Sequence, residues 1–398
     1  MAFFDELETR SADARAAAQI AALKAQLVRA RIGADIDDLD DLAALPVLRK
    51  SELSERQKAR PPFGGMAVSN VVHIFQSPGP IYEPGGIGHD WWRIGRFLNA
   101  VGIGRGDIVQ NCFSYHLTPA GMIFENGARA VGASVVPAGV GQTELQIQVA
   151  RDVGVTAYAG TPDYLKVILD KADELNVRLA ITKAAVGGGA LFPSLRQFYA
   201  ERGITCLQNY ATADLGNVAY ESPAMDGMIV DEGVIVEIVT PGTGRPVAEG
   251  RVGEVVVTSL NPDYPLIRFA TGDLSAMMAG ESPCGRTNKR IKGWMGRADQ
   301  ATKIKGMFVR PEQVAALVAR HPEVARARVI VRREEERDAL TVQVEAGDAS
   351  RQALEASVAA TLKLKGRIEI VSPGSLPDDG KVIDDQRSYD EPAGGADA

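Results

Sequence analysis

The sequence predicts an α/β protein with a large N-terminal domain of helix-covered, mostly parallel sheets and a small β-rich subdomain. A small α+β C-terminal domain follows it. Three observations carry this prediction. Strand-like and helix-like segments alternate from about residue 107 to 208, which is typical of a parallel sheet covered by helices. Short strands broken by PGTG and NPDYP turns fill residues 228–278, and the last hundred residues follow an α-β-β-α-β order.

In the alternating region, each apolar run is short enough for a strand and each intervening segment is long enough for a helix. The strand-like runs are DIVQNCF, ASVVPA, VTAYA, ITKAAV and ITCLQ. The helix-like segments are 119–131, 143–152, 162–175 and 191–202. Residues 1–31 also look helical, because alanine and leucine are spaced to form one apolar face.

The C-terminal region reads as a separate unit. PEQVAALVARHPEV and RQALEASVAATLKLKG are predicted helices, and ARARVIVRRE, ALTVQVEA and RIEIVS are predicted strands. We place the junction near GRADQATKIKG, at 296–306. The predicted domains are therefore 1–297 and 298–390, with a disordered tail at 391–398.

Composition narrows the class of protein. A chain of 398 residues with 45% hydrophobic and 24% charged residues indicates an ordinary globular protein of more than one domain. No apolar run is long enough to span a bilayer, and the N-terminus lacks the apolar core of a signal peptide. A net charge of −7 argues against nucleic-acid binding. The three cysteines lie far apart, so we expect neither a disulfide framework nor a zinc site, and we expect a cytoplasmic location.

Two stretches at the ends of predicted strands carry residues suited to nucleotide binding. In VGGGALFPSLRQ (186–197), consecutive glycines allow the backbone to approach a flat ligand, although a tight strand–helix turn explains them too. In QNYATADLG (208–216), Tyr210 suits stacking on a base and Asp214 suits holding a metal ion. A surface loop is the alternative for this second stretch.

Two further stretches follow downstream. In IRFATGDLS (267–275), Asp273 follows a Thr-Gly turn, where it either accepts hydrogen bonds from ribose hydroxyls or caps the turn. In GWMGRADQATKIKG (293–306), Arg297 and Asp299 lie at the glycine-bounded junction, where charged residues are often simply solvated.

Taken together and in this order, these stretches indicate a protein family far more specifically than any one of them does alone. PLIRFATGDL, SPCGRTNKRIKGWMGRAD and KIKGMFVRPEQVAALV resemble the AMP-forming adenylate enzymes, most closely the phenylacetate–CoA ligase branch. The resemblance covers nearly the whole chain. It implies a ligase that activates an organic, phenylacetate-like acid with ATP to an acyl-adenylate and transfers the acyl group to coenzyme A. Its implied ligands are ATP or AMP, Mg²⁺, coenzyme A and a small-molecule acid.

The resemblance also implies roles for single residues. The adenine loop comprises Gly187, Gly188, Gly189 and Ala190. Tyr210 stacks on adenine, Asp273 binds ribose and Arg297 contacts the ribose–phosphate. Asp214 stands where the family has a Mg²⁺-binding glutamate, and Asp299 stands at the hinge of the small domain.

Two more roles are implied by weaker matches. GSLPDDGKVIDDQ resembles the loop of the adenylation lysine, which makes Lys381 its candidate; a simple turn lysine is the alternative. NCFSYHLTPAGM (111–122) lies where the branch builds its acyl pocket, with Tyr115 and His116 as wall or gate. The alternative for His116 is a buried histidine bonded to backbone. The zinc seen in some relatives needs a cysteine and histidine cluster that this sequence does not carry, so no zinc is expected.

The family's phosphate loop, roughly S-S-G-T-T-G-K-P, is rewritten here. IFQSPGPIYEPGG (74–86) lies between a strand-like run and a helix-like segment, and it keeps Ser77, Gly79 and Pro84. Glu83 stands where the family has a lysine, so a charge that would attract phosphate is reversed. Three hypotheses remain: a CoA ligase, a non-catalytic nucleotide- or CoA-binding member of the fold, and an adenylating enzyme with another acceptor. A homodimer through the N-terminal helical segment is an additional expectation.

Overall fold

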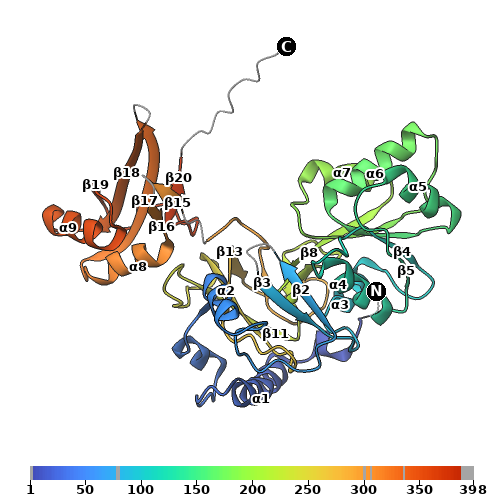
Figure 1. The fold of residues 1–398 in the computed structure, drawn as a ribbon, viewed down its shortest axis with the longest axis horizontal. Coiled ribbons are helices and arrows are strands. Elements are labelled where there is room, and N and C mark those ends of the chain that lie inside the picture. The colour runs from blue at the N-terminus through green and yellow to red at the C-terminus, as the bar shows by residue number, and fades with distance from the viewer. Residues whose placement is uncertain (1–2, 78–80, 299–301, 305–306, 335–336, 387–398) are drawn as a thin grey trace, which may run out of the picture. The chain divides into compact units, whose positions relative to one another are not determined.

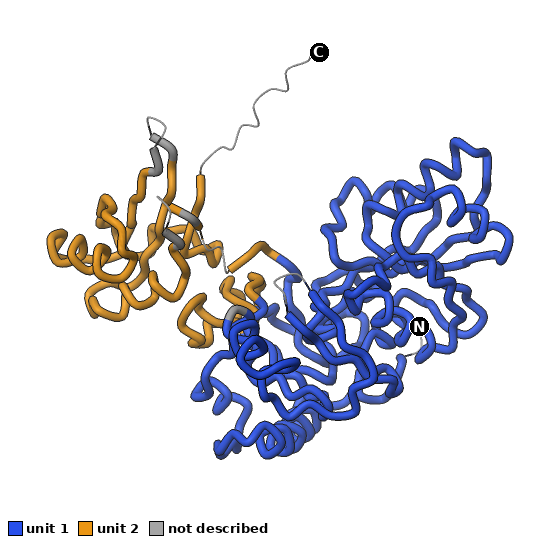
Figure 2. The backbone as a smooth tube through the Cα atoms, viewed as in Figure 1, with its two compact units in different colours: residues 1–237, 256–271, 277–294 blue, residues 238–255, 272–276, 295–398 orange. Residues whose placement is uncertain are grey.

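The computed structural model describes residues 3–77, 81–298, 302–304, 307–334 and 337–386. Gly79, Asp299 and the predicted tail 391–398 lie outside these residues. Two compact units divide the chain (Figure 2): unit 1 is 1–237, 256–271 and 277–294, and unit 2 is 238–255, 272–276 and 295–398. The division into domains 1–297 and 298–390 stays a prediction.

The predicted helix-covered parallel sheet is confirmed in unit 1 (Figure 1). Its five strands run in the order β5-β4-β6-β7-β8, and every neighbouring pair is parallel. The strands are β4 (Ile108–Asn111), β5 (Ser134–Val136), β6 (Ala157–Gly160), β7 (Lys183–Val186) and β8 (Thr205–Thr212). The helices between them are α4 (Ala120–Ala130), α5 (Thr143–Asp152), α6 (Pro162–Glu174) and α7 (Pro193–Glu201).

Apolar periodicity explains how this layer packs. All of β6 is buried, as expected for a strand covered on both faces. Helix α6 begins at Pro162 and buries Leu165, Ile168, Leu169 and Ala172, which recur every three or four residues on one face. These side chains belong to one core cluster with Tyr158 of β6. The segments therefore form a single helix-on-sheet layer.

The sheet continues beyond β8, which confirms the β-rich region; the pairs β8–β9, β9–β10, β10–β14 and β13–β14 are antiparallel. The strand order is β11-β12-β13-β14-β10-β9-β8. The strands are β9 (Gly216–Glu221), β10 (Met228–Val230), β11 (Val234–Val239), β12 (Val252–Ser259), β13 (Phe269–Met278) and β14 (Arg290–Ile291). Asp273 lies inside β13, so the predicted turn before it is wrong: the strand runs through Gly272, whose φ is +75°.

The N-terminal region packs on unit 1. It contains two 3-10 helices, η1 (Glu6–Thr9) and η2 (Leu39–Ala44), and the helices α1 (Ala12–Ala30) and α2 (Lys50–Ala59). Ser11 caps α1 by accepting a hydrogen bond from the Ala14 amide. Leu23 and Leu27 of α1 pack in one core cluster with Ile235 and Ile267. The short strand β1 (Leu48–Arg49) pairs in parallel with β13.

The described residues of the rewritten phosphate segment form two paired strands, so the predicted strand–turn–helix is wrong. β2 (His73–Ser77) and β3 (Ile81–Gly85) are antiparallel, with Ser77 opposite Ile81 and Phe75 opposite Glu83. Ile81 and Glu83 point inward while Tyr82 between them is exposed, which is the two-residue period of a strand. The proline and glycine content hid this alternation. The next helix, α3 (Gly95–Val101), begins ten residues after β3 ends.

The C-terminal region confirms the predicted α-β-β-α-β order. Its helices are α8 (Pro311–Ala319) and α9 (Arg351–Leu362), and its sheet has the order β19-β18-β17-β20. The strands are β17 (Val324–Glu334), β18 (Arg337–Ala346), β19 (Arg367–Val371) and an additional β20 (Ile383–Asp385), besides the small pair β15 (Thr302–Ile304) and β16 (Met307–Val309). Leu354, Val358 and Leu362 of α9 are fully buried, as their fourfold spacing predicts.

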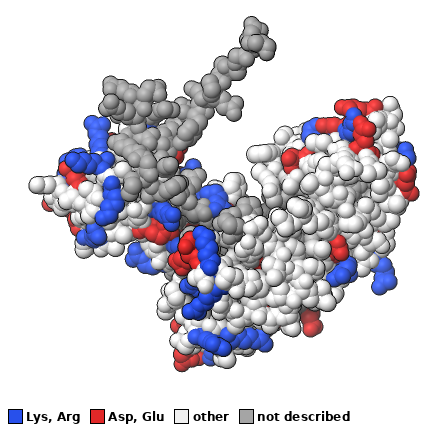
Figure 3. Space-filling view, in the orientation of Figure 1, with Lys and Arg blue, Asp and Glu red and all other residues white. Residues whose placement is uncertain are grey.

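Among the described residues, no helix is long and apolar enough to cross a membrane. Basic and acidic side chains are interspersed on the face drawn in Figure 3. A mixed surface of this kind agrees with the modest net charge of −7.

Candidate functional site

The predicted adenine loop leaves the carboxyl end of β7, beside the matching end of β8. Val186 of β7 pairs with Gln208 of β8, so the loop 187–190 lies alongside the segment that carries Tyr210. A Cβ atom on Gly187 would lie 2.4 Å from Asn209 Oδ1, and Gly188 has a φ of +68°. Both positions therefore require glycine. Loop and tyrosine meet at the edge of the sheet where ligands bind in open α/β folds.

The predicted acyl-pocket segment follows β4 and lies close to this loop. Phe113 lies within van der Waals distance of a Cβ built on Gly188, at 3.7 Å. Half-buried Tyr115 accepts a hydrogen bond from Asn111 Nδ2 at 2.8 Å, and burial raises its pKa, with the charge of Glu125 adding to the effect. His116 is exposed, so the alternative of a buried histidine is wrong. Its role as wall or gate stays a prediction.

The Mg²⁺ candidate Asp214 lies in the turn between β8 and β9 and is 4% exposed. Its Oδ2 accepts a hydrogen bond from Lys50 Nζ at 2.9 Å. Its Oδ1 is buried and accepts no hydrogen bond from the described residues. This orphan oxygen is what a carboxylate ligand needs, so Asp214 fits a hard cation.

Glu83 shares this buried environment. It is fully buried, and Ser77 Oγ donates a hydrogen bond to its Oε1. The pKa of Glu83 is raised to about 8, chiefly by burial and next by the charge of Asp214, against the opposing effects of Ser77 and Lys50. Like Asp214 Oδ1, Glu83 Oε2 is buried without a hydrogen-bond partner in the described part of the chain.

Tyr264 completes the group. It is 2% exposed, and its hydroxyl likewise finds no partner among the residues described. Burial raises its pKa well above the ordinary value, and the negative charges of Asp214 and Glu83 add to this shift. We call Ser77, Glu83, Asp214, Tyr264 and Lys50 the carboxylate cluster.

Unit 2 holds three other predicted residues. Arg297 Nη1 lies 3.1 Å from Asp273 Oδ1, and the two residues also form an isolated backbone bridge. Further backbone hydrogen bonds on either side join the same two segments: Ala298 N donates to Gly272 O at 2.7 Å, and Leu274 N donates to Gly296 O at 2.9 Å. The predicted ribose and ribose–phosphate residues are thus fixed next to each other.

The candidate adenylation lysine lies on the loop before β20. The Lys381 amide donates to Asp379 Oδ1 at 3.0 Å, and the same carboxylate is paired with Arg328 at 2.8 Å. A Cβ on Gly380 would lie 2.7 Å from a methyl of Val252 and 3.0 Å from one of Leu274. The loop therefore packs directly on the residue that follows Asp273, and Lys381 lines a groove of unit 2 with Arg245.

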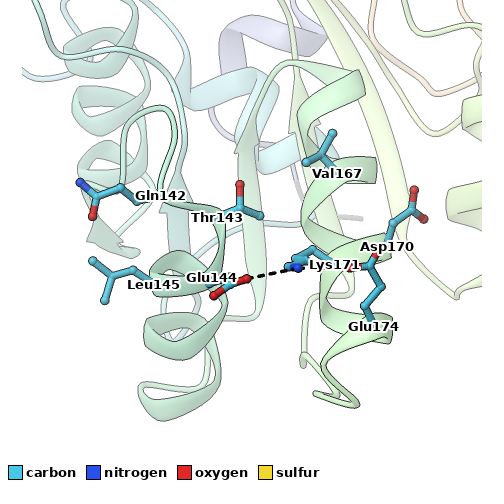
Figure 4. A pocket seen from close by; sticks show the side chains of 8 residues that line it. All are labelled: Gln142, Thr143, Glu144, Leu145, Val167, Asp170, Lys171 and Glu174. Atoms are coloured by element: carbon cyan, nitrogen blue, oxygen red, sulfur yellow. Dashed lines mark hydrogen bonds and ion pairs between the residues drawn. The ribbon is translucent and has the colours of Figure 1, made fainter.

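A separate surface groove lies between α5 and α6 (Figure 4). Lys171 there is 3.2 Å from both Glu144 and Glu174. None of the predicted site residues lines it, and exposed ion pairs of this kind contribute little. It is not a candidate for the chemistry.

Sequence reasoning missed Lys50 and Tyr264. Both lie far along the chain from Asp214, and each stands in a segment that predicts only a helix start or a turn. One signal was available: a glutamate at a phosphate-loop lysine position calls for a compensating cation elsewhere.

The fold and the ordered motifs define an AMP-forming adenylate enzyme. A solved 2-hydroxyisobutyryl-CoA ligase, in complex with 2-HIB-AMP and CoA, superposes with a TM-score of 0.67 at 24% identity, over 96% of this chain and 91% of that one. An open conformation of the same ligase gives a TM-score of 0.68 over 93% of this chain. No family model matches the sequence.

Curated relatives narrow the class. The phenylacetate–coenzyme A ligase of Aromatoleum evansii is 30% identical over 330 residues, which covers 78% of this chain and 73% of the relative. That of Pseudomonas putida is 30% identical over 349 residues, covering 79% and 77%. The Thermus thermophilus ligase is 29% identical over 329 residues. The chain belongs to the phenylacetate–CoA ligase family.

Proposed function

We propose that this protein activates an organic acid with ATP and passes the acyl group to coenzyme A. In the first step, a substrate carboxylate oxygen attacks the α-phosphorus, and the bond to pyrophosphate breaks. In the second step, the CoA thiolate attacks the acyl carbon and AMP leaves. The observation that carries the proposal is membership of the phenylacetate–CoA ligase family at 30% identity.

The chain's own residues suit these steps. The glycine loop 187–190 and Tyr210 would hold adenine, and Asp273 with Arg297 would hold the ribose and its phosphate. Lys381 would stabilise the developing negative charge during adenylation. Mg²⁺, held through Asp214, would neutralise phosphate charge. Asp299 would act as hinge between the half-reactions.

We further propose an aromatic acid as substrate. Phe113 stacks on Phe124 with ring centroids 4.3 Å apart, and it lies beside Gly188 of the glycine loop. Tyr115 and His116 follow it in the same segment. An acyl chain bound next to the adenine loop would meet this aromatic wall, which favours a planar apolar group.

The test is direct. Purified protein is incubated with ATP, Mg²⁺, CoA and a panel of aryl and alkyl acids, and AMP and acyl-CoA are measured by chromatography. Acid-dependent AMP formation matched by acyl-CoA is the expected result. AMP without loss of CoA thiol would indicate another acceptor.

A non-catalytic binding protein is the second candidate, favoured by the buried Glu83 at the phosphate-loop lysine position. Calorimetric binding of AMP or CoA with no turnover of any acid would establish it. Cytoplasmic location and a homodimer through the N-terminal helices remain predictions; gel filtration with light scattering tests the latter.

A further inference from the structure

The carboxylate cluster buries two acidic side chains whose oxygens the described residues satisfy only in part. Glu83 and Asp214 are 0% and 4% exposed, and Lys50 is the cation paired with Asp214. One oxygen of each carboxylate, Glu83 Oε2 and Asp214 Oδ1, accepts no hydrogen bond within the described part of the chain. Buried carboxylate oxygens without partners are costly, so the arrangement calls for a further positive ligand.

A third buried oxygen points to the same conclusion. The Tyr264 hydroxyl has no partner among the described residues and experiences the charges of both Glu83 and Asp214. The Lys50 side chain that pairs with Asp214 is about one-third exposed, so this end of the cluster reaches solvent.

We propose that Glu83 and Asp214 together form the protein carboxylates of a divalent-cation site, and that Lys50 is the counter-ion of Asp214 when the cation is absent. Within the described residues no group of three histidine, cysteine or acidic side chains is assembled for a metal. Two carboxylates agree with Mg²⁺, which is usually held by one or two carboxylates together with water and substrate phosphate.

This inference rests on the proposed function in one respect: it explains how the chain would hold triphosphate without the phosphate-loop lysine. The role of Asp214 belongs to that proposal. The new element is Glu83. It replaces the lysine that would contact phosphate directly, and its carboxylate would bind the metal ion instead. The phosphate loop would then act through a bound cation instead of through its own ammonium group.

The experiment uses the full chain and Mn²⁺ as probe, without nucleotide, with binding followed by electron paramagnetic resonance of free Mn²⁺. Glu83→Gln and Asp214→Asn should each weaken Mn²⁺ binding by at least about tenfold, since metal-site substitutions cost roughly 10–100-fold even outside the direct ligands. Lys50→Met should bind Mn²⁺ more tightly than the unaltered chain.

Glu221→Gln is the matched control. Glu221 is also buried, but both its oxygens already accept hydrogen bonds, from Arg196 and from the Gln208 amide. It should leave Mn²⁺ affinity unchanged. Circular dichroism and thermal unfolding establish that each variant is folded; because glutamine matches glutamate in size, Glu83→Gln isolates the charge.

Unchanged Mn²⁺ affinity in folded Glu83→Gln overturns the inference and makes Glu83 a neutral acid bonded to Ser77. Weaker binding by Lys50→Met overturns the role of Lys50. Normal AMP formation with no effect of Glu83→Gln on Mn²⁺ leaves the proposed function standing without this site. If Mn²⁺ binding depends on Glu83 but the protein forms no AMP, the cation site stands and the proposed function fails.

Discussion

Arg297 Nη1 lies 3.1 Å from Asp273 Oδ1, although 24 residues separate them in the chain. The Arg297 side chain is 44% exposed and Asp273 10% exposed, so the charged face of this pair is open on the arginine side. An ion pair this exposed stabilises a fold by only about 0.2–1 kcal/mol. Its contribution to folding is therefore small, and its role in nucleotide binding stays a prediction.

For this pair, we expect Arg297→Ala and Asp273→Asn each to weaken ATP binding by about tenfold to a hundredfold, since a hydrogen bond to a charged group contributes roughly 1.5–3 kcal/mol. Calorimetry measures the affinity, and urea unfolding should show a change of less than about 1 kcal/mol. Arg151→Ala, which removes an exposed pair with Asp152 at 2.7 Å, is the control. Intact ATP affinity with a large loss of stability would make the pair structural.

Lys381 is held at a defined place by its own backbone, because its amide donates to Asp379 Oδ1. We expect Lys381→Ala to slow adenylation by about 10²–10³-fold, as removal of a charge-stabilising donor does. Thioester formation from supplied acyl-AMP should continue. Single-turnover assays of both half-reactions measure this, with exposed Lys365→Ala as control. An equal loss in both half-reactions would remove Lys381 from its adenylation role.

Gly187 has no room for a side chain. A Cβ there would lie 2.4 Å from Asn209 Oδ1, so Gly187→Ala must displace Asn209, which bonds Asn217 at 3.0 Å. Overpacking of this kind costs about 1–3 kcal/mol. We also expect weaker AMP binding, because Tyr210, the predicted adenine-stacking residue, directly follows Asn209. Gly33→Ala has open space and should change unfolding by less than about 0.5 kcal/mol. Unaltered stability of Gly187→Ala would show that the loop relaxes freely.

Asp107 supplies a pH-dependent contribution to stability. Burial acts to raise its pKa, but Lys183, the Gly104 amide and Thr156 outweigh this and hold the pKa below its ordinary value of 3.8. Lys183 Nζ lies 2.8 Å away. A lowered pKa means that the folded state favours the ionised carboxylate. Its stabilisation is therefore complete above the unfolded pKa and is lost as the pH falls through the folded value.

Asp107→Asn should consequently be less stable than the unaltered chain at pH 7, by about 1–3 kcal/mol for the partners left unsatisfied. The difference should shrink as the pH falls below about 4. Urea unfolding across this pH range measures it, and exposed Asp152→Asn is the control. A difference that stays constant with pH would assign the effect to packing instead of charge.

The local sequence pattern was sufficient to predict a helix or strand wherever that element buries one periodic apolar face. The alternation from β4 to β8 and the α-β-β-α-β order are confirmed because strands of three to eleven residues and helices of nine to thirteen residues carry distinct apolar periods. The strand pair 73–77 and 81–85 was predicted wrongly because proline and glycine obscured a two-residue alternation that only pairing reveals.

By itself, the sequence determined the fold class, the order of the motifs and the family, since these depend on residue types along the chain. It also showed that Glu83 reverses a charge in the phosphate segment. Only the tertiary structure decided what surrounds that position: Glu83 is buried and electrostatically coupled to Asp214, Lys50 and Tyr264, and Lys50 bonds Asp214. The physical reason is that burial and electrostatic coupling arise between residues distant in the chain, and no local propensity specifies such contacts.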